Sequence, residues 1–179
     1  MDDRVVTLGL LLFGGGIVHL LLGIVVRRLH RLANASSQNW DDVLISALET
    51  PIRVVLWVFV AQLALRIFEL APGLHRQLVQ AYDTALVLLL AWFLHRLIAG
   101  IAAEMLAEGR GRTASADRAT VRAVAKLARI TLWVMAGLMV LQSVGVSISG
   151  LLAFGGIGGI AVGFAAKDLL ANFFGGLSI

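Results

Sequence analysis

Long apolar segments dominate this sequence and restrict the chain to a membrane fold. The segment from Val5 to Val26 has a single ionisable side chain, His19. About 20 consecutive apolar residues are enough for a helix to cross the hydrocarbon core of a bilayer. The chain of 179 residues is 59% hydrophobic and has a mean hydropathy of +0.91, which lies outside the range of water-soluble domains. The sequence therefore predicts an all-α integral membrane protein.

Five segments are predicted to cross the membrane, and they divide the chain into two parts. Residues 1–116 are predicted to form peripheral membrane helices, with spans at about 5–26, 52–70 and 84–103 and an interfacial segment at 39–50. Residues 117–179 are predicted to form a second module, with a span at about 127–146, a glycine-rich helix at 149–167 and an interfacial half-helix at 169–179. No internal repeat and no soluble domain are evident in this chain.

The last of these spans combines dense glycine with large apolar side chains. Gly155, Gly159 and Gly163 form two consecutive GxxxG steps. In lipid, small residues hold helices together because they let two backbones approach closely. Identical helices with small residues on two flanks can therefore pack side by side into a homo-oligomeric ring. A glycine-rich helix inside a monomeric bundle is the alternative.

The large side chains of this helix fall on one face. Ile160 and Phe164 are four residues apart and share a face of a helix. We expect one flank to carry Gly156, Gly159 and Gly163, and the opposite flank to carry Ala153, Ile157 and Ala161. If the flanks make the ring contacts, Ile160 and Phe164 face the axis, where apolar rings close a narrow pore by dewetting.

A polar pair interrupts the apolar run where the helix should leave the membrane. Lys167 and Asp168 are predicted to break the helix there, and Gly175 and Gly176 offer an alternative bend. The segment after the break would then lie near the interface, and Lys167 would line the inner mouth of the pore.

The segment AVGFAAKDLLANFFGG, residues 161–176, resembles the pore-helix signature of the small-conductance mechanosensitive (MscS-like) channel family. The preceding FGGIGGIAVG is similar to the low-conductance type of that family. The resemblance extends over about residues 117–179 and implies a homoheptameric, tension-gated ion channel of a bacterial inner membrane that protects against hypoosmotic shock. It also implies that Ile160 and Phe164 occupy the positions of the two apolar rings of the family. Asp168 stands where the family often has a kink-forming glycine. The family continues into a soluble cytoplasmic domain, so this sequence is expected to be part of a longer chain.

Basic residues are distributed unevenly around the predicted spans. Twelve of the 15 Lys and Arg residues fall on one side, which predicts an external N-terminus and a cytoplasmic C-terminus. Five of them are candidate contacts for anionic lipid headgroups: Arg96, Arg118, Arg122, Lys126 and Arg129. Arg66 and Glu69 can pair along one helix face, but the sequence assigns no role to them or to His95.

Several classes of function lack their usual residues. The chain has no cysteine, and its four histidines share no metal-ligand spacing. No nucleophile–base constellation is evident, so we expect no enzyme, no metal and no cofactor. The basic residues flank apolar spans, so we expect lipids and ions as partners and no nucleic acid. A secondary transporter with a broken helix and a non-conducting membrane scaffold are the alternatives. The lack of an inverted repeat argues against the transporter.

Overall fold

Five long helices make up the fold of the computed structural model. The structure describes residues 3–33, 40–67, 72–108 and 115–177. The helices are α1 (Asp3–Ala33), α2 (Trp40–Ile67), α3 (Pro72–Glu108), α4 (Ser115–Ser143) and α5 (Ser149–Leu177). Each contains a stretch that is long and apolar enough to cross a membrane, so the prediction of an all-α protein with five spans is confirmed.

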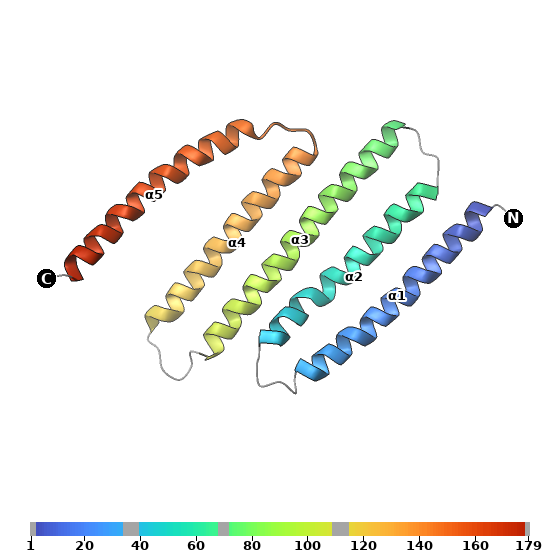
Figure 1. Ribbon diagram of the computed structural model, residues 1–179, viewed down its shortest axis with the longest axis horizontal. Coiled ribbons are helices and arrows are strands. Elements are labelled where there is room, and N and C mark those ends of the chain that lie inside the picture. Colours follow the sequence, from blue (N-terminus) through green and yellow to red (C-terminus); the bar gives the residue numbers. More distant parts are fainter. Residues whose placement is uncertain (1–2, 34–39, 68–71, 109–114, 178–179) are drawn as a thin grey trace.

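The first four helices lie side by side in a single antiparallel row (Figure 1). α1 packs on α2, α2 on α3 and α3 on α4. α5 begins beside the end of α4 and then diverges from it (Figure 1). A single row of helices has no enclosed core, so side chains are buried only along the seams between neighbouring helices.

Small residues occupy these seams. The buried apolar residues of the described chain include Val26, Ala47, Val60, Leu89, Ala91, Ala102, Ala125, Ala136 and Ile148. Alanine predominates because a small side chain lets two helix backbones approach closely in lipid. At Gly100, an added Cβ would lie 2.6 Å from Cγ1 of Val43, and at Gly15 it would lie 2.9 Å from Cγ2 of Val60. The α2–α3 and α1–α2 contacts therefore each depend on a glycine.

The helices extend further than the predicted spans. The interfacial segment 39–50 and the span 52–70 were expected to be separate, but α2 runs without interruption from Trp40 to Ile67 with Pro51 inside it. Proline removes one backbone hydrogen bond from a helix, a loss that packing against neighbouring helices compensates in membrane proteins. Pro51 is buried. α3 likewise begins well before the predicted span at 84–103, and its 37 residues reach about 55 Å.

A glycine C-cap ends α4 and turns the chain into α5. Gly145 has a φ of +88°, and its N–H donates to the carbonyl of Gln142 at 3.0 Å. The N–H of Val146 donates to the carbonyl of Leu141, also at 3.0 Å. These two bonds form a Schellman motif, which satisfies carbonyls at the end of the helix. This turn sets where α5 begins.

The four-helix row contains an internal repeat, which corrects the expectation that none exists. In α1–α2 the indole of Trp57 donates to His19, and in α3–α4 the indole of Trp133 donates to His95. Within each pair the partners are 38 residues apart, and the second pair follows the first at twice that separation.

Other features recur at the same offset. RVVLWV (residues 53–58) matches RITLWV (residues 129–134), and the end of α2 at Ile67 corresponds to the end of α4 at Ser143. α1 and α3 run in the same direction (Figure 1). The repeat is therefore a parallel duplication of one helical hairpin and not an inverted one.

Candidate functional site

α5 is almost without partners in its own chain. Every described side chain from residue 149 to 167 is exposed. The side chains of Ile160 and Phe164 are 62% and 63% exposed, and the helix places them one turn apart on the same face. The two predicted gate residues therefore form a continuous apolar surface that no described part of the chain covers.

The glycine flank of α5 is equally open. A Cβ added at Gly156, Gly159 or Gly163 would meet nothing within 4 Å. At Gly15 and Gly100, by contrast, an added Cβ would clash with a valine of the next helix. The glycines of α5 therefore leave room for a close contact that its own chain does not make.

Ala153 lies on a different face from the one expected. It precedes Ile160 by seven residues, which is about two helical turns. The uninterrupted helix therefore places Ala153 near the face of Ile160 and Phe164, and only Ala161 remains on the flank opposite the glycines. The expectation that Ala153 shares the flank of Ala161 is therefore corrected by the period of 3.6 residues per turn.

The predicted break in α5 is absent from this structure. The helix continues through Lys167 and Asp168 to Leu177 and includes Gly175 and Gly176. Lys167 is exposed, and the burial of the other three residues is not described. Glycine weakens a helix by about 1 kcal/mol but does not forbid it. A lone helix with no neighbour to turn against has no reason to bend at these positions.

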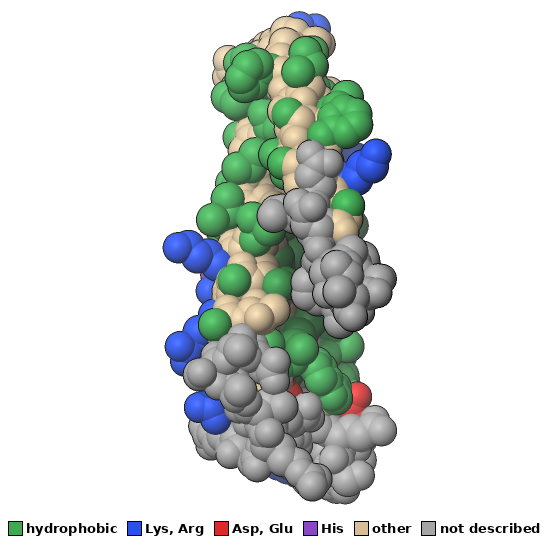
Figure 2. All heavy atoms as spheres, turned by 90° about the vertical axis from the view of Figure 1, so that its left-hand side faces the viewer, with side chains coloured by type: hydrophobic (Ala, Val, Ile, Leu, Met, Phe, Trp, Pro, Cys, Tyr) green, Lys and Arg blue, Asp and Glu red, His purple; other side chains and the backbone are tan. Residues whose placement is uncertain are grey.

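Four of the predicted lipid contacts lie along α4 and form a basic stripe: Arg118, Arg122, Lys126 and Arg129. Arg118, Arg122 and Lys126 are exposed, and Arg129 is partly buried. In Figure 2, which views the α5 side of the molecule, Lys and Arg side chains gather along one edge. The buried Nε atom of Arg129 has no hydrogen-bond partner within the described part of the chain. The stripe is thus available to anionic groups, and lipid contact at these residues stays a prediction.

Arg96 differs from the other predicted lipid contacts because its guanidinium has hydrogen-bond partners within the fold. Its guanidinium donates to Oγ1 of Thr50 at 3.0 Å and to the carbonyl of Ser46 at 2.8 Å. Both acceptors belong to α2, so Arg96 joins the two hairpins. This contact provides the partner that a basic residue within an apolar span requires.

Sequence reasoning missed the two Trp–His pairs and the surroundings of Arg66. Trp57 and Trp133 each donate to Nδ1 of a histidine at 3.2 Å. The equal spacing within the two pairs was the available signal. Arg66 lines a cavity between α2 and α3. Its expected partner Glu69 lies outside the described residues.

A family model matches the part of the chain that contains α4 and α5. Residues 126–167 match the model described as mechanosensitive ion channel, transmembrane helices 2/3. This part of the chain is similar to the corresponding membrane helices of mechanosensitive ion channels. The match ends at Lys167, so it includes the candidate membrane span of α5, Ser149–Lys167.

Curated relatives carry the same family name. The low conductance mechanosensitive channel YnaI of Escherichia coli is 46% identical over 63 residues, which are 35% of this chain and 18% of that protein. The large-conductance mechanosensitive channel MscMJLR of Methanocaldococcus jannaschii is 28% identical over 158 residues, which are 87% of this chain and 44% of that protein. The mitochondrial mechanosensitive ion channel protein 1 of Arabidopsis thaliana is 28% identical over 193 residues, covering 100% of this chain and 38% of that protein. This chain thus spans less than half the length of these relatives. No solved structure matches it.

Proposed function

We propose that this chain forms the membrane part of a homo-oligomeric ion channel that membrane tension opens. The observation that carries the proposal is the complete exposure of α5 between residues 149 and 167. A membrane helix with open glycines on one flank is suited to close packing against another helix. Copies of the same chain can supply that helix, and the similarity to mechanosensitive channels supports this choice.

The proposed pore is lined by one face of α5 from each copy. If Gly156, Gly159 and Gly163 pack against Ala161 of the neighbour, Ile160 and Phe164 of every copy point towards the axis. Each copy then contacts the next through two different surfaces, and such head-to-tail contacts close into a ring. The resemblance to the family implies seven copies.

Gating in this proposal is a shift between two packings of the glycine flank. At rest the Ile160 and Phe164 rings exclude water from a narrow constriction. The open ring occupies more area in the membrane, so tension favours it and shifts the population towards it. In a cell under hypoosmotic shock, the opened pore would release ions and small solutes.

The bend in α5 depends on the assembled state in this proposal. The bend at Lys167–Asp168, or at Gly175–Gly176, would form only when copies meet below the pore.

The proposed orientation has the N-terminus outside and the C-terminus in the cytoplasm of a bacterial-type inner membrane, because most Lys and Arg residues lie on one side.

The transporter and scaffold readings have less support. The parallel hairpin repeat lies in α1–α4 and leaves α5 outside it, whereas a transporter of the expected kind would bring two inverted halves together at a broken helix. A scaffold would not require a face of large apolar residues beside an open glycine flank.

Symmetry and tension response test the proposal together. The protein is reconstituted in lipid nanodiscs for electron microscopy and in liposomes for patch recording under suction. We expect a ring with seven-fold symmetry and a current that appears only above a threshold of suction. Monomers or dimers that stay silent up to the lytic tension of the patch would refute the channel.

A further inference from the structure

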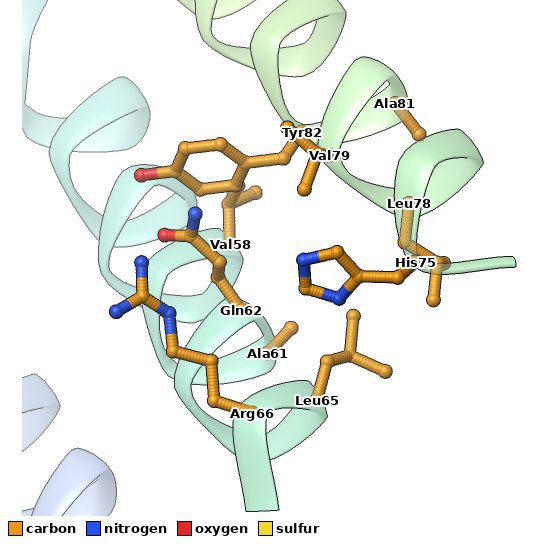
Figure 3. Close-up of a pocket in the computed structure, with 10 residues that line it drawn as sticks. All are labelled: Val58, Ala61, Gln62, Leu65, Arg66, His75, Leu78, Val79, Ala81 and Tyr82. Carbon is orange, nitrogen blue, oxygen red and sulfur yellow. The ribbon is translucent and has the colours of Figure 1, made fainter. Parts of the chain in front are cut away.

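A cavity of about 430 Å³ lies between the C-terminal half of α2 and the N-terminal part of α3 (Figure 3). Its walls are largely apolar and include Val58, Ala61 and Leu65 of α2 and Leu78 and Val79 of α3. The volume falls in the lower part of the range of small-molecule sites, about 300–1,000 Å³. The cavity is therefore large enough for a small apolar ligand such as an acyl chain.

Four polar side chains also border this apolar space. They are Gln62, Arg66, His75 and Tyr82. Figure 3 shows the His75 ring pointing from α3 towards α2, and the polar ends of Gln62, Arg66 and Tyr82 gathered on one side of the cavity. All four can donate hydrogen bonds, and one carries a permanent positive charge. The cavity thus combines an apolar wall with a donor-rich, cationic edge.

The charge of this edge is not balanced by the lining. None of the residues that line the cavity is acidic, and Arg66 has no ion pair within the described part of the chain. A guanidinium next to an apolar surface favours an anionic partner, because charge-assisted hydrogen bonds offset the loss of hydration. The lining therefore complements a ligand with an anionic head.

The internal repeat indicates that Gln62 and Arg66 are not needed for the two helices of a hairpin to pack together. At the repeat offset, Gln62 corresponds to Leu138 and Arg66 corresponds to Gln142. The second hairpin forms the same Trp–His contact with no amide at the first of these positions and no charge at the second. Gln62 and Arg66 are thus particular to the seam that contains the cavity.

We propose that this cavity binds a single acyl chain with an anionic head. The chain lies along the apolar walls, and Arg66 pairs with the anion, assisted by Gln62 and Tyr82. Such a ligand bridges the two hairpins at the end of their seam opposite the Arg96–Thr50 contact. The ligand is either a free fatty acid or an anionic bilayer lipid that inserts one of its chains. This inference does not depend on the proposed channel activity.

Binding of radiolabelled palmitate to the full chain in phosphatidylcholine nanodiscs tests the proposal. We expect saturable binding that Arg66→Gln weakens by at least about tenfold, since a charge-assisted bond is lost. Arg76→Gln is the matched control, because Arg76 is exposed and does not line the cavity. Hexadecanol, which has the same tail without the anion, should compete poorly with palmitate. Equal binding by the wild type and Arg66→Gln would overturn the proposal.

Filling the cavity with larger side chains tests whether the acyl chain of the ligand lies there. Ala61→Trp should abolish palmitate binding, and Val58→Phe is a second, smaller filling that keeps the test valid if the first variant fails to fold. Unchanged binding in a folded filling variant would place the ligand elsewhere and refute the site.

Nanodiscs of phosphatidylglycerol then identify the source of the ligand. Reduced palmitate binding indicates that an anionic bilayer lipid occupies the cavity, and undiminished binding indicates a free fatty acid. Conduction is not measured in these experiments, so their outcome is independent of the proposed channel.

Discussion

Trp57 of α2 donates its indole N–H to Nδ1 of His19 of α1 at 3.2 Å, with the two rings tilted and their centroids 6.1 Å apart. Trp133 and His95 repeat this contact between α4 and α3 with the same hydrogen-bond distance and centroids 6.0 Å apart. Because tryptophan can only donate, each histidine accepts at Nδ1, and a neutral ring therefore carries its proton on Nε2. The recurrence of one polar contact in two hairpins indicates that it fixes how the helices of each hairpin align.

The two Trp–His bonds should contribute equally to stability. Replacing Trp57 or Trp133 with Phe removes the donor and keeps most of the apolar surface. Each variant should lose about 0.6 kcal/mol, a typical value for a hydrogen bond between membrane helices. Thermal unfolding in detergent, followed by circular dichroism, measures the loss. Trp92→Phe, which lies in α3 and has no such bond among the described residues, is the control and should show no comparable loss.

Gly100 should be intolerant of any side chain, because an added Cβ would lie 2.6 Å from Val43. Gly100→Ala should lower the free energy of unfolding by about 1–3 kcal/mol through overpacking. Adding Val43→Ala makes room and should recover part of the loss, which thermal unfolding of the single and double variants would show. Gly9→Ala, where an added Cβ meets nothing within 4 Å, is the matched control. If the double variant were no more stable than Gly100→Ala, the α2–α3 contact would be assigned wrongly.

The glycine flank of α5 should matter only in the assembly. Leucine at Gly159 or Gly163 meets open space in the single chain, so these variants should keep their helical content. They should nevertheless lose the oligomer or its normal gating, which size-exclusion chromatography with light scattering and patch recording can detect. Gly14→Leu has equally open space in α1 and should assemble as wild type. Normal assembly and conduction of both α5 variants would show that this flank makes no contact between copies.

Topology can be read by chemical labelling in intact cells. Cysteine is introduced into the cysteine-free chain at Ser115 or at Gln77. A membrane-impermeant maleimide should reach the cysteine at Gln77 and miss the one at Ser115, because the basic residues before α4 are retained in the cytoplasm. Labelling after cell lysis controls for the reactivity of each site. The reverse pattern of labelling would invert the orientation.

Phe164 should control both resting leak and conductance. Phe164→Ser adds a polar atom per copy to the proposed constriction, so the pore should hydrate at lower tension and raise the resting current. Phe164→Leu keeps the ring apolar but smaller, so the gate should stay closed at rest while the open conductance rises. Patch recording of both variants decides the matter. Wild-type resting current in the first together with wild-type conductance in the second would remove Phe164 from the pore.

The number of spans and the special character of α5 could be predicted from the sequence because they are local properties. A run of apolar residues lowers its free energy in lipid whatever its neighbours are, and the GxxxG spacing of Gly155, Gly159 and Gly163 fixes their common flank through the helical period alone. The face shared by Ile160 and Phe164 follows from the same period. The same period also corrects the position expected for Ala153.

Tertiary structure alone decided how the helices meet and where they end. The sequence predicts a separate span that begins just after Pro51. Packing against neighbouring helices instead keeps α2 continuous through this residue. The pairing of Trp57 with His19, the contact of Gly100 with Val43 and the cavity beside Arg66 each join residues from different helices. Such contacts depend on the rotation and register of two helices, which apolar lipid-exposed surfaces constrain only weakly. The sequence determined that five helices form and which of them has small flanks, and packing between helices determined which polar groups find one another.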